Sequence, residues 1–145
     1  MLNRNLIGKV YKPLTFKITG ERLKIFAKAT GQTDPIYFDH EAAIMQGHKG
    51  IMCPPTFLIV VGMEQKKPFQ FLEDLEIKIE RILHAGQEFN YEEIVYEGDK
   101  LVMETKIIDM YDKKEGTLQF CVLQTKFKNQ NSIHVATLEN TIVVR

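Results

Sequence analysis

The fold depends on how one apolar segment folds, namely Gly50-Ile51-Met52-Cys53-Pro54-Pro55-Thr56-Phe57-Leu58-Ile59-Val60-Val61-Gly62-Met63-Glu64. An apolar run as short as residues 57–61 suits a buried strand as well as a helix. Two features favour a helix. Proline suits the first turn of a helix, and the segment is apolar nearly all round, as a helix enclosed by a sheet must be. The residue pattern alone leaves both interpretations open.

The chain after residue 75 has the pattern of long β-strands. Four strand-like segments cover roughly residues 77–91, 100–111, 117–128 and 132–144. Residues 111–116 and 129–131 have the composition of hairpin turns, and Gly98-Asp99 marks another turn. Successive hairpins favour an antiparallel meander. Alternation along the last segment places one set of side chains on a common face: His134, Ala136, Leu138, Asn140, Ile142 and Val144.

Two helices are predicted before the apolar segment. Thr19 suits the N-cap of the first helix, and Glu21 suits the positive end of its dipole. Gly31 can end this helix in a left-handed conformation. The second helix is short. It is predicted to begin near Asp39, to cover residues 40–45 and to close at Gly47.

Length and composition indicate an ordinary globular protein. The 145 residues suit one domain over 1–145, with 44% hydrophobic and 26% charged residues. Lys plus Arg equals Asp plus Glu, at 19 each, so neither a nucleic acid nor a polybasic membrane surface is supported as a partner. The N-terminus lacks the apolar core of a signal peptide, and no apolar run approaches a membrane span. We therefore expect a cytoplasmic protein.

Cysteine and histidine give no sign of a metal or redox site. Cys53 and Cys121 show neither metal-ligand spacing nor a disulfide framework. Cys53 precedes the predicted helix, where a thiol pKa can fall, yet a small buried residue is the simpler interpretation. The four histidines have no carboxylate or thiolate at ligand spacing. We expect no metal and no cofactor.

A second segment has the features of an active-site loop: Ala29-Thr30-Gly31-Gln32-Thr33-Asp34-Pro35-Ile36-Tyr37-Phe38-Asp39. The plainest interpretation is a turn between two helices. Five further stretches accompany the loop: Glu41-Ala42-Ala43, Cys53-Pro54-Pro55-Thr56-Phe57, residues 81–89, Tyr96-Glu97-Gly98-Asp99 and the terminal residues 140–145. Together, in this order, they resemble the MaoC-like dehydratases and (R)-specific enoyl-CoA hydratases, in particular the MaoC-like N-terminal dehydratase domain.

This resemblance implies an α+β fold made of a single hot-dog domain. In that fold a curled antiparallel sheet wraps around a central helix, so residues 54–64 are expected to be the helix rather than a strand. The resemblance also implies a partner, because such a domain has open sheet edges. We expect a homodimer, or a heterodimer with a catalytic MaoC-type subunit.

The loop departs from the family's Gly-Asp-x-Asn-Pro-x-His pattern at the residues that transfer protons. Gly31 and Pro35 match, Asp34 replaces the amide, Gln32 takes the place of the catalytic Asp and Tyr37 that of the catalytic His. Dehydration of a 3-hydroxyacyl thioester needs a base for the α-proton and an acid for the hydroxyl. Gln32 accepts no proton, and a phenol with an ordinary pKa near 10 is a poor base.

The resemblance therefore implies the acyl-thioester-binding, largely non-catalytic subunit of an (R)-3-hydroxyacyl-CoA or acyl-carrier-protein (ACP) dehydratase, or of an enoyl-CoA hydratase. Its ligand would be an acyl-CoA or acyl-ACP thioester. Two alternatives stay open. One is a stand-alone acyl-CoA-binding or regulatory hot-dog protein. The other is a self-sufficient hot-dog hydratase using Tyr37 or His84, or a thioesterase.

The predicted substrate-binding residues are Gln32, Asp34, Tyr37, Thr56 and Phe57. Backbone amides of Thr56 and Phe57 at the start of the central helix suit a thioester carbonyl; that the prolines merely start a helix is equally supported. For His84 a structural role is the better-supported interpretation. The apolar residues of the segment are core, with one or two also lining an acyl tunnel: Phe57, Leu58, Val61 and Met63.

Overall fold

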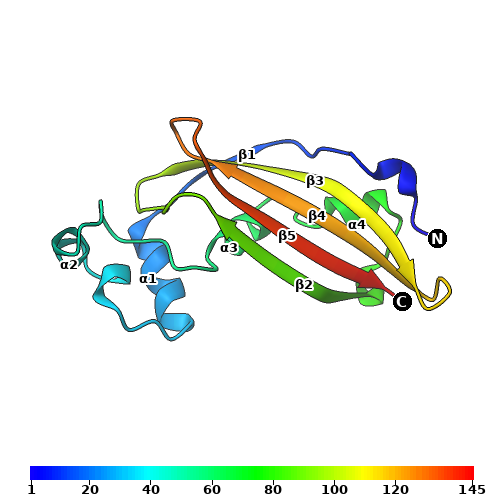
Figure 1. The fold of residues 1–145 in the computed structure, drawn as a ribbon, viewed down its shortest axis with the longest axis horizontal. Helices are drawn as coiled ribbons and strands as arrows, with labels where there is room; N and C mark the ends of the chain where they lie inside the picture. Colours follow the sequence, from blue (N-terminus) through cyan, green and yellow to red (C-terminus); the bar gives the residue numbers. More distant parts are fainter.

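A computed structural model describes residues 1–145, which build one five-stranded antiparallel sheet (Figure 1). Its strands are β1 (Leu14–Lys17), β2 (Ile82–Tyr91), β3 (Lys100–Lys113), β4 (Leu118–Lys128) and β5 (His134–Val144). Their order in the sheet is β1-β3-β4-β5-β2. Strands β3, β4 and β5 form the predicted meander. Strand β2 pairs with β5 instead of β3, so β1 and β2 are the free edges.

Four short α-helices accompany the sheet: α1 (Gly20–Ala29), α2 (His40–Met45), α3 (Leu58–Met63) and α4 (Gln70–Asp74). Three single turns of 3₁₀-helix cover Arg4–Leu6, Pro35–Tyr37 and Ile79–Arg81. Figure 1 shows α1 and α2 beyond one end of the sheet. Helices α3 and α4 share a cavity with the sheet face, so they lie against it. No helix has the length and apolar character needed to cross a membrane.

The two helices predicted before the apolar segment are confirmed. Helix α1 starts after Thr19 and is followed by Gly31, whose φ of 75° is left-handed. Thr19 occupies the predicted N-cap position, although its side chain makes no capping hydrogen bond. Helix α2 is capped by Asp39, whose Oδ1 accepts the amide of Ala42 at 2.7 Å.

The apolar segment forms a helix, α3, and the strand interpretation is wrong. The helix is shorter than residues 54–64, because it begins only at Leu58. The amide of Phe57 donates to the carbonyl of Pro54 at 3.0 Å, so a separate turn closes before the helix starts. Pro54 and Pro55 therefore precede the helix and do not form its first turn.

The predicted strand over 77–91 begins later, at Ile82. Helix α4, which we did not predict, occupies part of the preceding stretch and ends at a left-handed Glu76 with a φ of 55°. The amide of Ile77 donates to the carbonyl of Leu72, and the amide of Glu76 donates to the carbonyl of Glu73. In this type of helix end, the residue at the position of Glu76 is usually glycine. Because no glycine stands here, the sequence contains no sign that a helix ends at this point. Strand β1 was also missed; it has only four residues.

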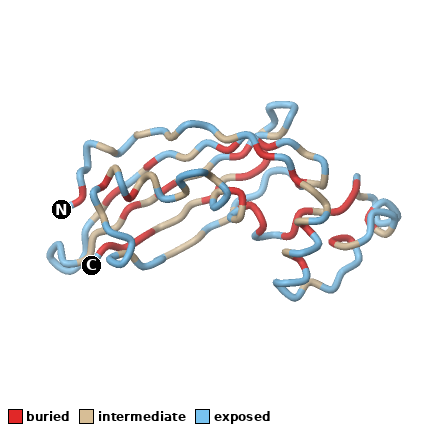
Figure 2. Tube along the Cα trace, turned by 180° about the vertical axis from the view of Figure 1, so that it is seen from behind, coloured by how far each residue is buried: buried red, intermediate tan, exposed pale blue.

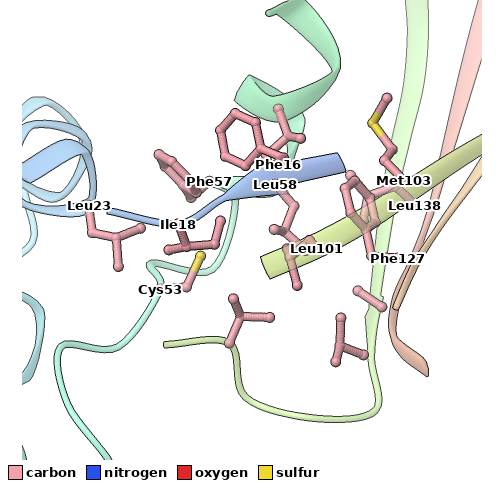
Figure 3. Packing of buried hydrophobic residues seen from close by; sticks show 14 of the residues in the cluster. Phe16, Ile18, Leu23, Cys53, Phe57, Leu58, Leu101, Met103, Phe127 and Leu138 are labelled. Atoms are coloured by element: carbon pink, nitrogen blue, oxygen red, sulfur yellow. The ribbon is translucent and has the colours of Figure 1, made fainter. Parts of the chain in front are cut away.

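The largest hydrophobic cluster lies where α1 and α3 meet the sheet (Figure 3). Phe57 is 1% exposed and packs edge-to-face on Phe26, with ring centroids 5.4 Å apart. A second cluster lies where α4 meets the sheet and includes Leu72, Ile107 and Ile142. Figure 2 shows that the helical end of the molecule is largely exposed.

Candidate functional site

A cavity of about 480 Å³ lies between the sheet and the α3–α4 segment. Twelve of its twenty lining residues are hydrophobic. The sheet contributes Met103, Leu123, Phe127, Leu138 and Ile142, and the helical segment contributes Leu58, Ile59, Met63, Phe69 and Phe71. Ile59, Met63 and Phe69 are also exposed to solvent, so the cavity opens to the outside beside α3 and α4. An apolar cavity with a few polar groups is typical of a small-molecule site.

The cavity wall carries five polar side chains from four strands: His84, Gln87, Thr105, Thr125 and Asn140. The hydroxyls of Thr105 and Thr125 satisfy each other at 2.9 Å. The buried Oε1 of Gln87 and Oδ1 of Asn140 have no hydrogen-bond partner. His84 is exposed and makes no hydrogen bond to the protein. Of these five residues, only His84 was considered as a site residue from the sequence. Asn140 was placed on the same strand face as Leu138 and Ile142, and this placement was the only sign that it could line a site.

The 32–37 loop is held by its own backbone and side chains. The Oδ1 of Asp34 accepts the amide of Ile36 at 3.1 Å and so caps the turn Pro35–Tyr37. The amide of Gln32 donates to the carbonyl of Ala27 at 2.9 Å, while its side chain makes no hydrogen bond to the protein. The Asp34 carboxylate is therefore already engaged in a structural bond.

Tyr37 points into the protein. It is 9% exposed and belongs to a small cluster with Ala27, Ile36 and Ala43. Burial, followed by the charges of Asp34 and Cys53, raises the pKa of the Tyr37 phenol above its ordinary value. Raising the pKa of a phenol keeps it protonated over a wider range. At neutral pH Tyr37 therefore stays protonated and supplies even less phenolate in the folded protein than in water.

The start of α3 has two backbone amides with no partner in the protein, those of Thr56 and Leu58. The amide of Phe57 between them is engaged by Pro54, which contradicts its predicted availability, and its side chain lies in the core. Leu58 was missed because its place as first helical residue was not visible in the sequence. The hydroxyl of Tyr91 donates to the carbonyl of Pro55 and ties this turn to the end of β2.

A second cavity, of about 320 Å³, is lined by Met52, Cys53, Pro55 and residues 91–95. Burial and the charge of Asp99 raise the pKa of the Cys53 thiol far above its usual range. Cys53 is thus unreactive and packs as a small apolar residue. Residues 32–37 line neither cavity. Of the four residues predicted to line an acyl tunnel, Leu58 and Met63 line the larger cavity, whereas Phe57 and Val61 line neither cavity.

The sequence relatives agree with this architecture. Residues 5–138 match the family described as FAS1-like, dehydratase domain region. A UPF0336 protein of Leifsonia xyli subsp. xyli is 33% identical over 147 residues, which cover 99% of this chain and 96% of that protein. The chain belongs to this dehydratase-region family. The family resemblance stated from the sequence is therefore confirmed.

Solved structures confirm the hot-dog fold. The C-terminally truncated HadBC (3R-hydroxyacyl-ACP dehydratase) complex from Mycobacterium tuberculosis superposes with a TM-score of 0.83 at 22% identity, covering 95% of this chain and 96% of that one. A MaoC-like dehydratase from Phytophthora capsici gives a TM-score of 0.79 at 19% identity. This superposition covers 99% of the present chain and 50% of the Phytophthora capsici chain. The chain thus shares its overall fold with these dehydratases.

Proposed function

We propose that the chain is the acyl-thioester-binding, largely non-catalytic subunit of an (R)-3-hydroxyacyl-CoA or acyl-ACP dehydratase, or of an enoyl-CoA hydratase. The observation that carries this proposal is the state of Tyr37. At the position of the family's catalytic His stands a buried phenol with a raised pKa. Gln32, at the position of the catalytic Asp, has no ionisable group. The two loop positions that transfer protons in the family therefore supply no base at neutral pH.

The larger cavity is the proposed acyl site. Its apolar walls suit a hydrocarbon chain, since each buried methylene contributes about 0.8 kcal/mol. The free amides of Thr56 and Leu58 lie at the start of the helix that forms one wall. We assign them to the thioester carbonyl and propose that the 32–37 loop, including Gln32, contributes to the head-group end, although it does not line the cavity itself. No cofactor is needed for this role.

A partner subunit completes the proposal. Strand β2 is a free edge of the sheet, and a free edge is stabilised by pairing with another strand. Leu83 and Tyr91 on this strand are 47% and 42% exposed. The similar HadBC structure is described as a complex. We propose a homodimer, or a heterodimer with a MaoC-type subunit that carries an intact Asp/His loop, in the cytoplasm.

One observation favours a second function, a self-sufficient hydratase. His84 lines the larger cavity, and its ring has no hydrogen bond to the protein that would assign it a structural role. An imidazole in such a place is able to act as a general base. It lacks a carboxylate partner within hydrogen-bonding distance, so this function is the weaker of the two.

Hydration of crotonyl-CoA and longer enoyl-CoAs tests the proposal. The purified chain alone should show turnover near background. Co-expressed with a catalytic MaoC-type subunit, it should raise the activity on long enoyl-CoAs above that of the subunit alone. Substantial turnover by the chain alone that His84→Ala abolishes would establish the second function. Turnover abolished by Tyr37→Phe would show that the loop itself is catalytic.

A further inference from the structure

A β-bulge builds the polar part of the larger cavity's wall. Strand β2 pairs with β5 as His84 with Ile142, then Gly86 with Thr141, then Gln87 with Asn140, so Ala85 is an extra residue. In a regular strand, side chains alternate and residues 84 and 87 would point to opposite faces. Bulges re-aim side chains in this way. Here the bulge brings His84 and Gln87 to the cavity, beside Asn140.

These side chains have unused hydrogen-bonding capacity. The Nε2 of Gln87 donates to the carbonyls of Glu88 at 3.2 Å and Glu139 at 3.1 Å. Those bonds fix the amide's orientation and leave Oε1 as an acceptor without a donor in the protein. The Asn140 side-chain amide makes no hydrogen bond to the protein. Rotation about its χ2 torsion therefore breaks no hydrogen bond. A buried polar group left unpaired destabilises the fold unless a ligand pairs it.

The polar group lies far from the proposed thioester end. Tyr91 is bonded to Pro55 and so marks the start of α3 on β2. Gln87 precedes Tyr91 by four residues, about 13 Å at 3.3 Å per residue. Between them the wall carries the apolar Met103, Phe127 and Leu138. The only polar side chains at this level are Thr105 and Thr125, whose hydroxyls bond to each other. A hydroxyl on the third carbon of an acyl thioester would not reach Gln87.

We propose that His84, Gln87 and Asn140 recognise a hydroxyl group carried by an acyl chain far from its thioester. The inference rests on the proposed function. A hydroxyl is both donor and acceptor, so it can donate to the oxygen of Gln87 and accept from Asn140 or His84. A ketone only accepts and would leave the Gln87 oxygen unpaired. An unsubstituted chain would leave the buried oxygens of Gln87 and Asn140 unpaired.

Calorimetry on the full chain tests this with decanoyl-CoA, 3-hydroxydecanoyl-CoA and isomers hydroxylated at the last few carbons. At least one remote isomer should bind about three- to tenfold more tightly than decanoyl-CoA, the gain expected of one net hydrogen bond. The 3-hydroxy compound should show no gain. Asn140→Leu should remove the gain, retain decanoyl-CoA binding and leave the midpoint of thermal unfolding equal or higher. Gln87→Met provides a second variant, and Thr141→Val, on the opposite face of β5, is the control.

Equal affinity for every isomer would overturn hydroxyl recognition while leaving acyl binding intact. So would an equal loss of decanoyl-CoA and hydroxydecanoyl-CoA binding in both Asn140→Leu and Gln87→Met. A probe without a thioester separates this inference from the proposed function: 1-decanol compared with decyl methyl ether, which has no hydroxyl proton to donate, in thermal unfolding. Stabilisation by the alcohol alone, lost in Asn140→Leu, would support hydroxyl recognition even if no acyl-CoA binds and the proposed function fails.

Discussion

The Nδ1 of His40 lies 2.5 Å from the Oε1 of Glu97, which joins the first residue of α2 to the turn before β3. The same carboxylate oxygen accepts the amide of Ile51 at 3.1 Å. A Cβ at Gly20, the first residue of α1, would overlap the other carboxylate oxygen. One side chain thus contacts α1, α2 and the segment leading to α3. Glu97 ties the helical end of the molecule to the sheet.

The stability that Glu97 provides should depend on pH. Burial raises its pKa, but the bonds from His40 and Ile51 and the charges of His40 and Lys24 lower it more, so the pKa lies below its ordinary value. A carboxylate with a lowered folded-state pKa stabilises above its unfolded-state pKa and loses this as pH falls through the folded-state value. Glu97→Gln should therefore lower the free energy of unfolding by about 1–2 kcal/mol at pH 7.

Urea unfolding of wild type and Glu97→Gln at pH 7 and at pH 3 checks this. The difference should shrink at the acidic pH, because the unfolded-state carboxyl binds a proton there more readily than the folded-state carboxylate with its lowered pKa. The exposed Glu80 makes no side-chain hydrogen bond, so Glu80→Gln is the matched control and should change little at either pH. An undiminished difference at pH 3 would show that the carboxylate charge is not what stabilises this junction.

The Tyr37 hydroxyl should be dispensable for folding, whereas the ring should not. The hydroxyl makes no hydrogen bond in the protein, and the ring packs with Ala27, Ile36 and Ala43. Tyr37→Phe should change the free energy of unfolding by no more than about 0.5 kcal/mol. Tyr37→Ala should cost about 3 kcal/mol through the cavity it leaves. Chemical denaturation measures both; a large loss in Tyr37→Phe would reveal a bond through the hydroxyl that supports the loop.

The edge of β2 should carry the subunit contact. Size-exclusion chromatography with light scattering should show a dimer or a larger species. Leu83→Lys places a charge beside the free edge and should shift the protein toward monomer while the far-UV circular dichroism is retained. Val102, which is 39% exposed on β3, lies between strands that are already paired, so Val102→Lys should remain dimeric. A wild-type monomer at micromolar concentration would contradict edge pairing.

The long strands and first two helices could be predicted because their signals are local. Alternation over ten or more residues defined β3, β4 and β5, and an aspartate cap with a following glycine defined α2. Helix α4 was missed because Glu76, rather than glycine, ends it in the left-handed conformation. Strand β1 was missed because four edge residues are too few for alternation to show. Helix α3 was predictable only through the family resemblance.

The candidate site was harder to predict because its geometry depends on distant pairing. Gln87 and Asn140 are 53 positions apart in the sequence, yet they face each other in the β2–β5 register. Gly86 is compatible with a bulge in residues 81–89, but the sequence does not show that the bulge turns His84 and Gln87 to the same side. The sequence also suggested a free amide at Phe57, but hydrogen bonding to Pro54 depends on where α3 begins. Register and helix starts are properties of the whole fold.

The last prediction concerns the length of the acyl chain that the larger cavity accepts. Gly62 lies in α3 on the cavity wall, and a Cβ at this position would meet no atom within 4 Å. Gly62→Ala should therefore be tolerated and should stabilise the helix by up to about 1 kcal/mol. Gly62→Leu should fold as well but place a branched side chain in the space proposed for the acyl chain.

Calorimetry with acetyl-, hexanoyl- and decanoyl-CoA measures the effect. In the wild type, affinity should rise with chain length by about 0.8 kcal/mol per buried methylene until the cavity is filled. Gly62→Ala, as the matched control, should keep that profile. Gly62→Leu should retain hexanoyl-CoA binding and lose the further gain for decanoyl-CoA, because its side chain occupies the distal space. Identical profiles for the two variants would show that the acyl chain binds elsewhere. The cavity of about 320 Å³ beside Cys53 would then be the next candidate.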